Sequence, residues 1–314
     1  MKLDPKTTAF LFPGQGSQTV GMGKALAEEF PEAKAPFDEA DSILGFSLST
    51  LMWDGPDADL NDTVNTQPGL FLHSFVSFQT FSRLFPGFEP DSVAGHSLGE
   101  LSALSAAGAL SFADGLRLVR ARGELMKRAG ELAPGSMAAI LGLDIPTLDK
   151  VCAEASAVNE IVQVANDNCP GQVVISGAKA AVERAMAGAK AAGAKRALPL
   201  AVSIAAHSPL MAPIQEEWNQ AVDSVMMNDP KIPVIGNVHA SVLKTADECR
   251  ADIKAQMQSR VRWTDSVMAM SERGIKSFVE VGTGTVLGGL VKRIASDGAN
   301  YPLGNPQDFK ALDG

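Results

Sequence analysis

The sequence predicts an α/β protein in which a small unit of two helices and four strands is inserted into a larger α/β unit. Two observations support this prediction. Short β-prone runs alternate with helical apolar patterns on both sides of residues 134–201, which is typical of a sheet covered by helices. Residues 134–201 themselves follow the order β-α-β-β-α-β, which is typical of a ferredoxin-like unit. We therefore expect a large subdomain formed by residues 1–133 and 202–314 and a small ferredoxin-like subdomain formed by residues 134–201.

Composition limits the class of protein. The chain has 314 residues, of which 46% are hydrophobic, enough for one sizeable core and a smaller unit. Its formal net charge of −9 and the lack of a basic stripe argue against a nucleic-acid partner. No apolar run approaches the roughly 20 residues of a membrane span, and residues 1–8 are polar, unlike a signal peptide. We therefore expect a cytoplasmic protein with no membrane partner.

Neither a metal nor a cofactor is predicted. Cys152, Cys169 and Cys249 are odd in number and lack C-x-x-C spacing, so we expect structural thiols rather than a disulfide framework or a zinc site. The glycine-rich stretch 282–289 follows a predicted strand, but its spacing is not G-x-G-x-x-G. Too little chain remains after Gly289 for the second half of a dinucleotide-binding fold.

The chain begins with a short buried strand over residues 7–12, which a Pro-Gly pair ends. Gln15 lies in the glycine-rich turn that follows. Residues 22–53 carry helical apolar spacing with breakers, and residues 66–85 are predicted to form one long amphipathic helix. His73 lies within this helix beside phenylalanines, so we interpret it as a packing residue rather than a catalyst.

Gly95, Ser97 and Gly99 form a G-x-S-x-G motif between a β-prone run and a helical pattern. This arrangement is typical of the nucleophile elbow of an α/β-hydrolase-like sheet, and we expect the large subdomain to be of that kind. The sharp turn strains the backbone of Ser97, and the two glycines leave room for it. The backbone N–H of Leu98 would then face an oxyanion formed on a carbonyl that Ser97 attacks. The flanks favour a nucleophile over a loop that contains two glycines by chance.

A helix is predicted from Ser111, an N-cap whose capping box Asp114 closes, to about residue 129. Charges on a helix usually form a solvated face, so the pattern alone singles out none of its basic residues. These are Arg117, Arg120, Arg122, Lys127 and Arg128.

The inserted unit should place a cleft between itself and the larger unit, and such clefts are favoured ligand sites. Its strands are predicted at residues 137–143, 161–165, 172–176 and 196–200, and its helices at 146–155 and 179–192. Asn166 and Asn168 precede Pro170-Gly171 in a predicted turn, where they are either turn residues or ligand contacts. The sequence leaves both interpretations open.

After residue 202 the chain returns to the large unit. Two further buried strands are predicted at 232–236 and 277–281, with helices near 245–258 and 263–273. His207 lies on a loop before a proline, where functional residues gather. His96 should project away from Ser97, and His239 lacks support from a motif, so His207 is the candidate base. From the residues alone, a loop histidine without a catalytic role is an equal alternative.

Taken together, these stretches resemble the malonyl-CoA:acyl-carrier-protein transacylases and the acyltransferase domains of fatty-acid and polyketide synthases. The similarity covers nearly the whole chain in order. It is carried by Phe-Pro-Gly-Gln-Gly-Ser-Gln at 12–18, Gly-His-Ser-Leu-Gly at 95–99, Arg122 in Arg-Ala-Arg-Gly-Glu, residues 166–176, His207 in His-Ser-Pro-Leu-Met and Val-Glu-Val-Gly at 279–282.

The resemblance implies that the protein moves a malonyl group from coenzyme A to the phosphopantetheine thiol of an acyl carrier protein, through an acyl-serine, and supplies extender units for fatty-acid synthesis. It implies that Ser97 is the nucleophile and His207 its base. A stand-alone acyltransferase of a polyketide pathway, a serine thioesterase or hydrolase, and a non-catalytic carrier-docking module are the alternatives.

The resemblance also implies roles for further residues. The backbone N–H groups of Gln15 and Leu98 would form the oxyanion hole, and Arg122 would bind the malonyl carboxylate. The backbone carbonyl of Arg262 would orient His207. Ala206 departs from the family, since domains that select malonate often carry Phe there, and the smaller residue makes selection of malonate less strict.

Recognition of the carrier is expected to need a local basic patch, because carrier proteins are acidic and this chain is acidic too. Lys190, Lys195 and Arg196 are the candidates in the small subdomain, beside the expected cleft.

Overall fold

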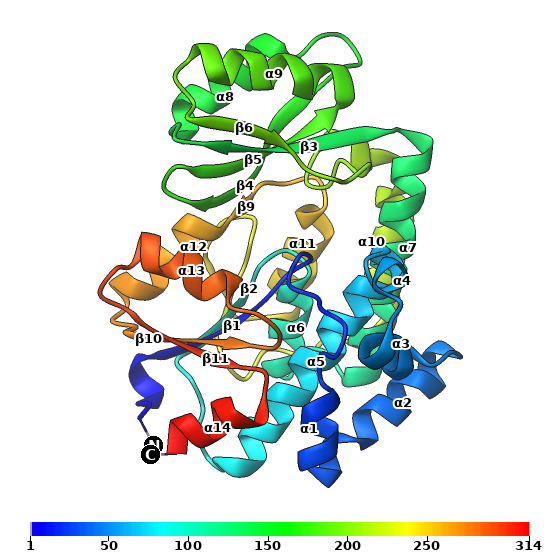
Figure 1. The fold of residues 1–314 in the computed structure, drawn as a ribbon, viewed down its shortest axis with the longest axis vertical. Coiled ribbons are helices and arrows are strands. Elements are labelled where there is room, and N and C mark those ends of the chain that lie inside the picture. The colour runs from blue at the N-terminus through cyan, green and yellow to red at the C-terminus, as the bar shows by residue number, and fades with distance from the viewer. Residues whose placement is uncertain (1, 314) are drawn as a thin grey trace.

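The computed structural model describes residues 2–313, which form a mixed α/β structure with two sheets (Figure 1). The larger sheet has the strand order β11-β10-β1-β2-β7-β8, and all of its neighbours are parallel except β7 and β8. Its strands are β1 (Thr8–Phe12), β2 (Ser92–Gly95), β7 (Val234–Ile235), β8 (Val242–Leu243), β10 (Ser277–Val281) and β11 (Ala299–Leu303).

Both faces of this sheet are buried, and the alternation of side chains along β1 shows why. Phe10 and Phe12 belong to the main hydrophobic core, where they pack against phenylalanines of α5 (Thr63–Leu84). Ala9 and Leu11 point to the opposite face, into a core shared with α12 (Trp263–Glu272) and α13 (Val286–Ile294). A strand with period-two alternation can be apolar on both faces only where helices cover both faces.

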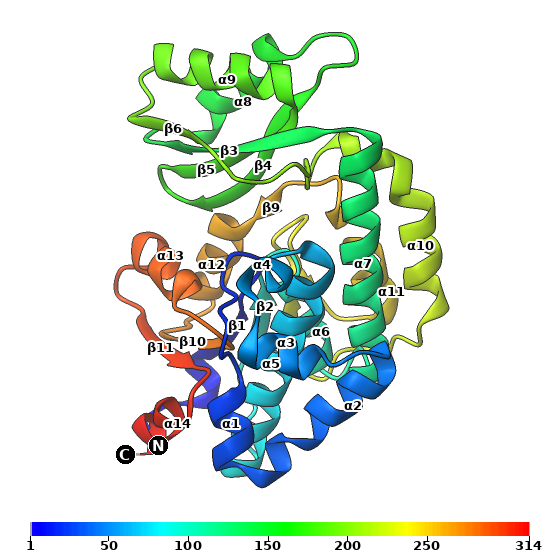
Figure 2. The same cartoon turned by 45° about the vertical axis from the view of Figure 1, so that its right-hand side comes forward.

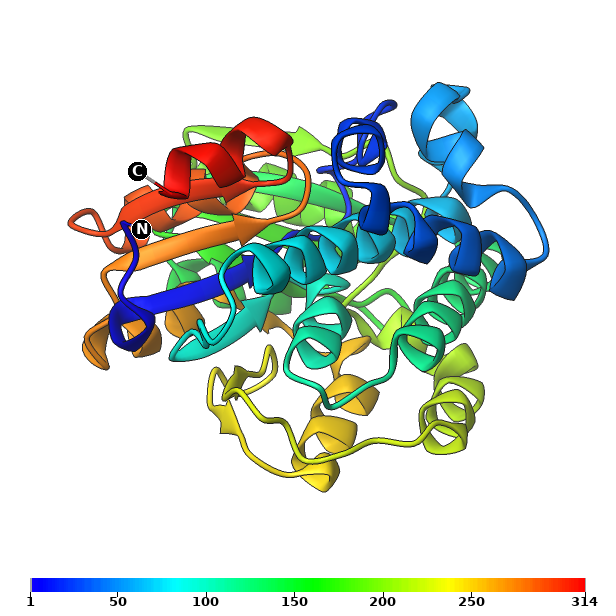
Figure 3. The same cartoon turned by 90° about the horizontal axis from the view of Figure 1, so that it is seen from below.

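Besides α5, nine helices of the described chain contribute side chains to the main core, whereas α12 and α13 pack on the opposite face of the sheet. Seen from below, α5 crosses the sheet, and the two chain ends lie side by side near α14 (Figure 3). The helices are α1 (Lys24–Glu29), α2 (Ala35–Leu44), α3 (Leu48–Asp54), α4 (Asp57–Leu60), α6 (Gly99–Ala106), α7 (Phe112–Leu132), α10 (Gln215–Ser224), α11 (Ala246–Gln256) and α14 (Pro306–Asp313).

The second sheet lies above the first, with two helices on its far face (Figures 1 and 2). Its order is β6-β3-β5-β4-β9, and its first four strands are antiparallel neighbours. The short β9, which comes from the C-terminal part of the chain, pairs in parallel with β4. The elements are β3 (Gly135–Leu141), α8 (Ile145–Ala155), β4 (Val162–Cys169), β5 (Gln172–Ala178), α9 (Lys179–Ala191), β6 (Arg196–Pro199) and β9 (Val261–Arg262).

Most of the predicted elements are present with ends shifted by a few residues, but one prediction is wrong. Asn166 and Asn168 lie on β4 rather than in a turn. The strand continues to Cys169 because two register irregularities let its pairing with β5 run past the asparagines, and only Pro170 and Gly171 turn. The strands β8, β9 and β11 and the helices α4, α10 and α14 were not predicted, and β8 and β9 have only two residues each.

No helix within residues 2–313 is long and apolar enough to span a membrane. The three cysteines are buried and unpaired, and the described part of the chain holds no group of three metal-ligating side chains.

Candidate active site

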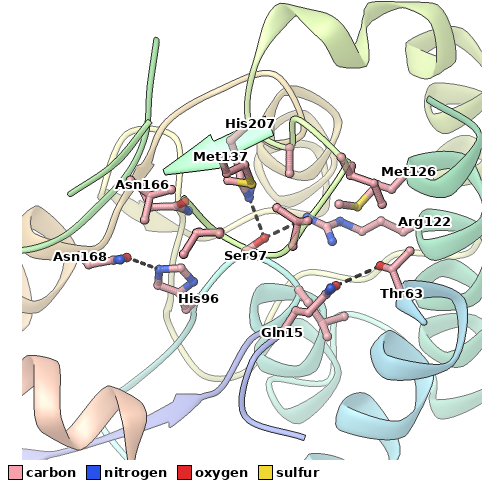
Figure 4. A pocket seen from close by; sticks show the side chains of 16 residues that line it. Gln15, Thr63, His96, Ser97, Arg122, Met126, Met137, Asn166, Asn168 and His207 are labelled. Atoms are coloured by element: carbon pink, nitrogen blue, oxygen red, sulfur yellow. Dashed lines mark hydrogen bonds between the residues drawn. The ribbon is translucent and has the colours of Figure 1, made fainter. Parts of the chain in front are cut away.

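A cavity of about 250 Å³ lies where the two sheets face each other, and side chains from both enclose it (Figure 4). The loop after β1, the turn after β2 and the helices α5 and α7 supply one side. The strands β3, β4 and β5 and the segment 200–207 supply the other. The lining residues are Gln15, Thr63, His96, Ser97, Leu98, Arg122, Met126, Met137, Asn166, Asn168, Val174, Leu200, Val202, Ile204, Ala206 and His207.

Ser97 occupies the sharp turn between β2 and α6 that the motif predicts. Its φ is 54°, a left-handed value that is costly for a residue with a side chain. The flanking glycines are required by close packing: a Cβ on Gly95 would lie 1.9 Å from the carbonyl group of Gly99, and one on Gly99 would lie 2.1 Å from the carbonyl oxygen of Phe12. The turn is held by Asn237, whose Oδ1 accepts from the Ser97 N–H at 2.8 Å.

His207 meets Ser97 in this cavity. The Ser97 Oγ and the His207 Nε2 are 2.7 Å apart, although 109 residues lie between them in sequence. His207 lies on the loop before a 3₁₀ helix (Pro209–Ile214), with a left-handed φ of 58°, and it is only 3% exposed. The strained backbone conformation of His207 therefore directs its imidazole toward Ser97.

The other imidazole nitrogen faces backbone carbonyls at the end of α11. His207 Nδ1 lies 2.9 Å from the carbonyl oxygen of Gln256 and 3.2 Å from that of Ser259. Gln256 is the last residue of α11 and Ser259 follows it, so neither carbonyl accepts within the helix. The Gln256 carbonyl accepts from the Ser259 N–H at 3.1 Å and has a second lone pair for Nδ1. The expectation that the Arg262 carbonyl orients His207 is wrong, because Arg262 lies in β9, where its carbonyl accepts from the Ser266 hydroxyl.

Burial, followed by the positive charge of Arg122, lowers the pKa of His207 from 6.5 to about 3. The imidazole is therefore neutral at pH 7. Since the carbonyl oxygens at Nδ1 can only accept, we assign the proton to Nδ1, and Nε2 is left to accept a proton from Ser97.

Arg122 is buried rather than part of a solvated helix face, with only 2% of its surface exposed. Its Nη1 donates to Gln67 Oε1 at 2.9 Å, and its Nη2 donates to Gln256 Oε1 at 2.9 Å and to Ser97 Oγ at 3.0 Å. Burial lowers its pKa to about 10, so it stays charged at pH 7. Arg122 forms no salt bridge within residues 2–313, which leaves a buried positive charge facing the cavity.

The predicted oxyanion donors line the same cavity. Leu98 precedes the first residue of α6, and Gln15 lies in the turn after β1. Neither backbone N–H donates a hydrogen bond to any atom of the described chain. Gln15 is held by its side chain, whose Oε1 accepts from the Thr63 hydroxyl at 2.9 Å.

Comparison with known proteins decides the family. The model of a family described as acyl transferase domain matches residues 9–300. The chain belongs to this family. It is similar to the malonyl CoA-acyl carrier protein transacylase of Haemophilus influenzae, with 44% identity over 98% of each chain.

Solved structures of the family superpose closely on this acyltransferase. An acyl carrier protein S-malonyltransferase from Vibrio cholerae matches with a TM-score of 0.94 and 43% identity, over 98% of this chain and 99% of that one. A malonyl-transacylase solved in complex with a type II PKS acyl-carrier protein matches with a TM-score of 0.92 and 40% identity, over 97% and 98% of the two chains.

Three polar residues complete the wall of the acyltransferase pocket: His96 from the turn after β2, and Asn166 and Asn168 from β4. His96 points away from Ser97 toward Asn168, and its Nε2 lies 2.8 Å from the Oδ1 of that residue (Figure 4). The His96 ring also contacts Trp263 edge-on. Asn166 is buried and lines the pocket. Both asparagines therefore face the cavity. This position is the one that the interpretation of Asn166 and Asn168 as ligand contacts requires.

The three basic residues predicted for carrier docking lie elsewhere. Lys190, Lys195 and Arg196 are exposed, and none of them lines the pocket. Lys190 is on α9, on the far face of the small sheet, and Arg196 starts β6 four residues before the lining residue Leu200. At about 3.3 Å per residue, this places Arg196 roughly 13 Å from the pocket wall.

Sequence reasoning missed three residues that hold the site together. Arg122 donates to Gln67, and the elbow donates to Asn237. The backbone carbonyl of Gln256 faces His207. Gln67 lies inside a predicted helix and Gln256 near the end of another, and amides at such places carry no signal of their own. The Asn237 position next to a predicted strand end was the one available hint.

Proposed function

We propose that this protein transfers a malonyl group from coenzyme A to the phosphopantetheine thiol of an acyl carrier protein, and so supplies extender units for fatty-acid synthesis. One observation carries the proposal: the Ser97 hydroxyl lies 2.7 Å from the His207 imidazole and 3.0 Å from the Arg122 guanidinium. A serine beside a neutral base is equipped for acyl transfer, and the buried cation suits an acyl group with a free carboxylate. The relatives named malonyl transacylases support the same activity.

In the first half-reaction Ser97 is the nucleophile and His207 the general base. As Oγ attacks the thioester carbonyl, Nε2 takes the hydroxyl proton, and the resulting imidazolium is stabilised by the carbonyls at Nδ1. The carbon–sulfur bond then breaks, the coenzyme A thiolate leaves and takes that proton, and malonyl-serine remains. In the second half-reaction the carrier thiol gives its proton to His207 Nε2 and its sulfur attacks the ester carbonyl. The carbon–oxygen bond then breaks, Ser97 Oγ takes that proton back from Nε2, and the malonyl group remains on the carrier as a thioester.

The tetrahedral intermediate needs donors for its oxygen anion. We assign this role to the unpaired backbone N–H groups of Gln15 and Leu98. Such donors are typically worth about 3 kcal/mol each in the transition state. Leu98 supplies its N–H at the start of α6, where the helix dipole also favours negative charge.

Arg122 is proposed to bind the malonyl carboxylate. Its planar guanidinium can give two parallel hydrogen bonds to a carboxylate, which a Lys side chain cannot do. Nη2, which now contacts Ser97 Oγ, is available to a substrate that places its acyl carbon at that oxygen. Ala206, beside the base, leaves room next to the malonyl α-carbon, so we expect selection against branched malonyl groups to be loose.

Two alternative functions differ from this one in the acceptor. A stand-alone acyltransferase of a polyketide pathway has the same site, and one structural relative was solved with a type II PKS acyl-carrier protein. A serine thioesterase or hydrolase would pass the acyl group to water. The buried Arg122 and the absence of any carboxylate bound to His207 Nδ1 among the described residues favour the transferase.

We also propose the division into subdomains that the sequence predicts: residues 1–133 and 202–314 as a large α/β-hydrolase-like subdomain, and residues 134–201 as a small ferredoxin-like one. The order β6-β3-β5-β4 with α8 and α9 on one face supports it, as does the separate hydrophobic core of the small unit. Carrier docking at Lys190, Lys195 and Arg196 stays a prediction, and so does a cytoplasmic location.

The experiment that tests the activity is the intact mass of the protein after mixing with malonyl-CoA. A stable gain of one malonyl group, lost again when a holo carrier protein is added and recovered on the carrier, is the expected result. Release of free coenzyme A with no gain of mass would show a hydrolase, and neither event would show a non-catalytic module.

A further inference from the structure

A pair of buried carboxyl groups lies behind the pocket, and the proposed reaction does not use it. Glu100, in the first turn of α6, is fully buried, and Asp252 of α11 is 5% exposed. Burial raises the pKa of Glu100, and the neighbouring Asp252 raises it further through its charge and a side-chain hydrogen bond. Two carboxylates in contact in a buried place cannot both be ionised without a large cost, so one of them holds a proton.

The surroundings place that proton on Glu100. Asp252 Oδ2 accepts from two backbone N–H groups, those of Asn237 at 3.1 Å and Val238 at 3.4 Å, which stabilise a charge there. Glu100 Oε1, in contrast, is buried and finds no donor among the described residues. If Oε1 carries the proton, Glu100 donates to Asp252 and this unsatisfied atom disappears. The pKa of Glu100, which burial and then the charge of Asp252 raise well above 4.5, agrees with this placement of the proton.

The second oxygen of Glu100 accepts from the side chain of Gln256, which is the centre of the site. Gln256 Nε2 donates to Glu100 Oε2 and, at 2.9 Å, to the carbonyl oxygen of Ser97. Its Oε1 accepts from Arg122 Nη2, and its backbone carbonyl faces His207 Nδ1. One residue therefore contacts the nucleophile, the base and the cation.

Only one orientation of the Gln256 amide satisfies all of these neighbours. If the amide were turned by 180°, its NH₂ group would face the guanidinium of Arg122, and its oxygen would face the carbonyl oxygen of Ser97. A donor would then face a donor at Arg122, and an acceptor would face an acceptor at Ser97. Glu100 stabilises the productive orientation because its Oε2, in the neutral acid, can only accept.

We propose that Glu100 is a positioning residue: as a neutral acid it donates to Asp252 and accepts from Gln256, and so it keeps the Gln256 amide turned toward Arg122. The effect on substrate rests on the proposed function, in which Arg122 binds the malonyl carboxylate. Without the acceptor at Glu100, the Gln256 amide loses one of the three contacts that fix its orientation. Its contact with Arg122 is then weaker, and the guanidinium is held less firmly in the cavity.

Two substitutions of similar size separate this role from simple packing. Glu100→Gln keeps one donor toward Asp252 and one acceptor toward Gln256, whereas Glu100→Met fills the space with neither. We expect Glu100→Gln to keep kcat/KM for malonyl-CoA within a few-fold of wild type. Glu100→Met should lower it by about 10- to 100-fold, the usual loss for a hydrogen bond to a charged group, while kcat/KM for acetyl-CoA falls less. An equal loss in both variants, or none in Glu100→Met, would overturn the proposal.

Infrared difference spectroscopy at pH 7 tests the protonation state without any substrate. The spectrum of wild type minus Glu100→Gln should contain the carbonyl band of a protonated carboxylic acid, because all other carboxyl groups cancel. The exposed Glu124→Gln on α7 is the matched control and should remove only a carboxylate band. A carboxylate band in the Glu100 difference would refute the proposal, even if wild type failed to react with malonyl-CoA and the proposed function fell on its own.

Discussion

The Nη2 atom of Arg122 lies 3.0 Å from the hydroxyl oxygen of Ser97, so a buried positive charge and the proposed nucleophile share one wall of the pocket. In the proposed reaction this charge, shielded from water, would act on both ends of a malonyl group. It would attract the free carboxylate, and it would lie near the carbonyl that Ser97 attacks. Changes to Ser97, to its base and to Arg122 should therefore have different and separable effects.

Ser97→Ala should abolish labelling by malonyl-CoA, because it removes the one atom that becomes acylated. The fold should remain, since the change deletes a hydroxyl at the pocket and no core contact. Intact mass measures the labelling and thermal unfolding measures the fold. Ser105→Ala, in the same helix α6, is the matched control and should label normally. Labelling of Ser97→Ala at another residue would refute the assignment.

His207→Ala should slow acylation by about 2–4 orders of magnitude, the usual worth of a positioned general base. Stopped-flow release of coenzyme A in a single turnover measures the step directly. The exposed His239→Ala is the control and should leave the rate unchanged. If His207→Ala loses less than about tenfold, a different group acts as the base.

The acylation rate should not titrate at the ordinary pKa of histidine. Because burial and the charge of Arg122 lower the pKa of His207 from 6.5 to about 3, the folded protein keeps a neutral base as the pH falls below 6.5. The single-turnover rate should thus stay level from about pH 8 to pH 5. A rate that halves near pH 6.5 would contradict this account. The unfolded chain does take up the proton near 6.5, so stability should fall as the pH decreases from 6.5 toward 3.

Reversing the charges of Lys190, Lys195 and Arg196 should raise the KM for the carrier protein and leave self-acylation by malonyl-CoA unchanged. Long-range attraction to an acidic carrier mainly speeds encounter, so the effect should shrink as salt is added. The two half-reactions are measured separately. Since none of the three residues lines the pocket, an equal loss in both half-reactions, or no loss at all, would place the docking surface elsewhere.

The fold and the elbow were predictable because their signals are local. Ser97 is marked by two glycines that steric contacts require, and strand and helix patterns flank it within a few residues. His207 and Arg122 carry no such mark. They reach Ser97 only through the tertiary fold, and the family resemblance selected them where periodicity would have left a loop histidine and a surface arginine.

The prediction for Arg262 failed for a related reason. A histidine can be oriented by any backbone carbonyl, and a carbonyl has no side chain that a sequence motif could record. The carbonyls that face His207 belong to Gln256 and Ser259, three to six residues earlier, at the end of α11. The place where a helix ends, rather than a residue type, decides which carbonyls are available.

The central claim is that Arg122 makes this pocket a site for an acyl group with a free carboxylate, and the ratio of kcat/KM for malonyl-CoA to that for acetyl-CoA tests it most directly. Arg122→Ala would leave a malonyl carboxylate buried without a partner, whereas an acetyl group escapes that penalty. Arg117→Ala, on the exposed side of the same helix, is the matched control and should keep the wild-type ratio. We predict that the ratio in Arg122→Ala falls by about 10- to 100-fold, the worth of a charge-assisted pair. An unchanged ratio would contradict the assignment of Arg122 and of malonyl as the substrate.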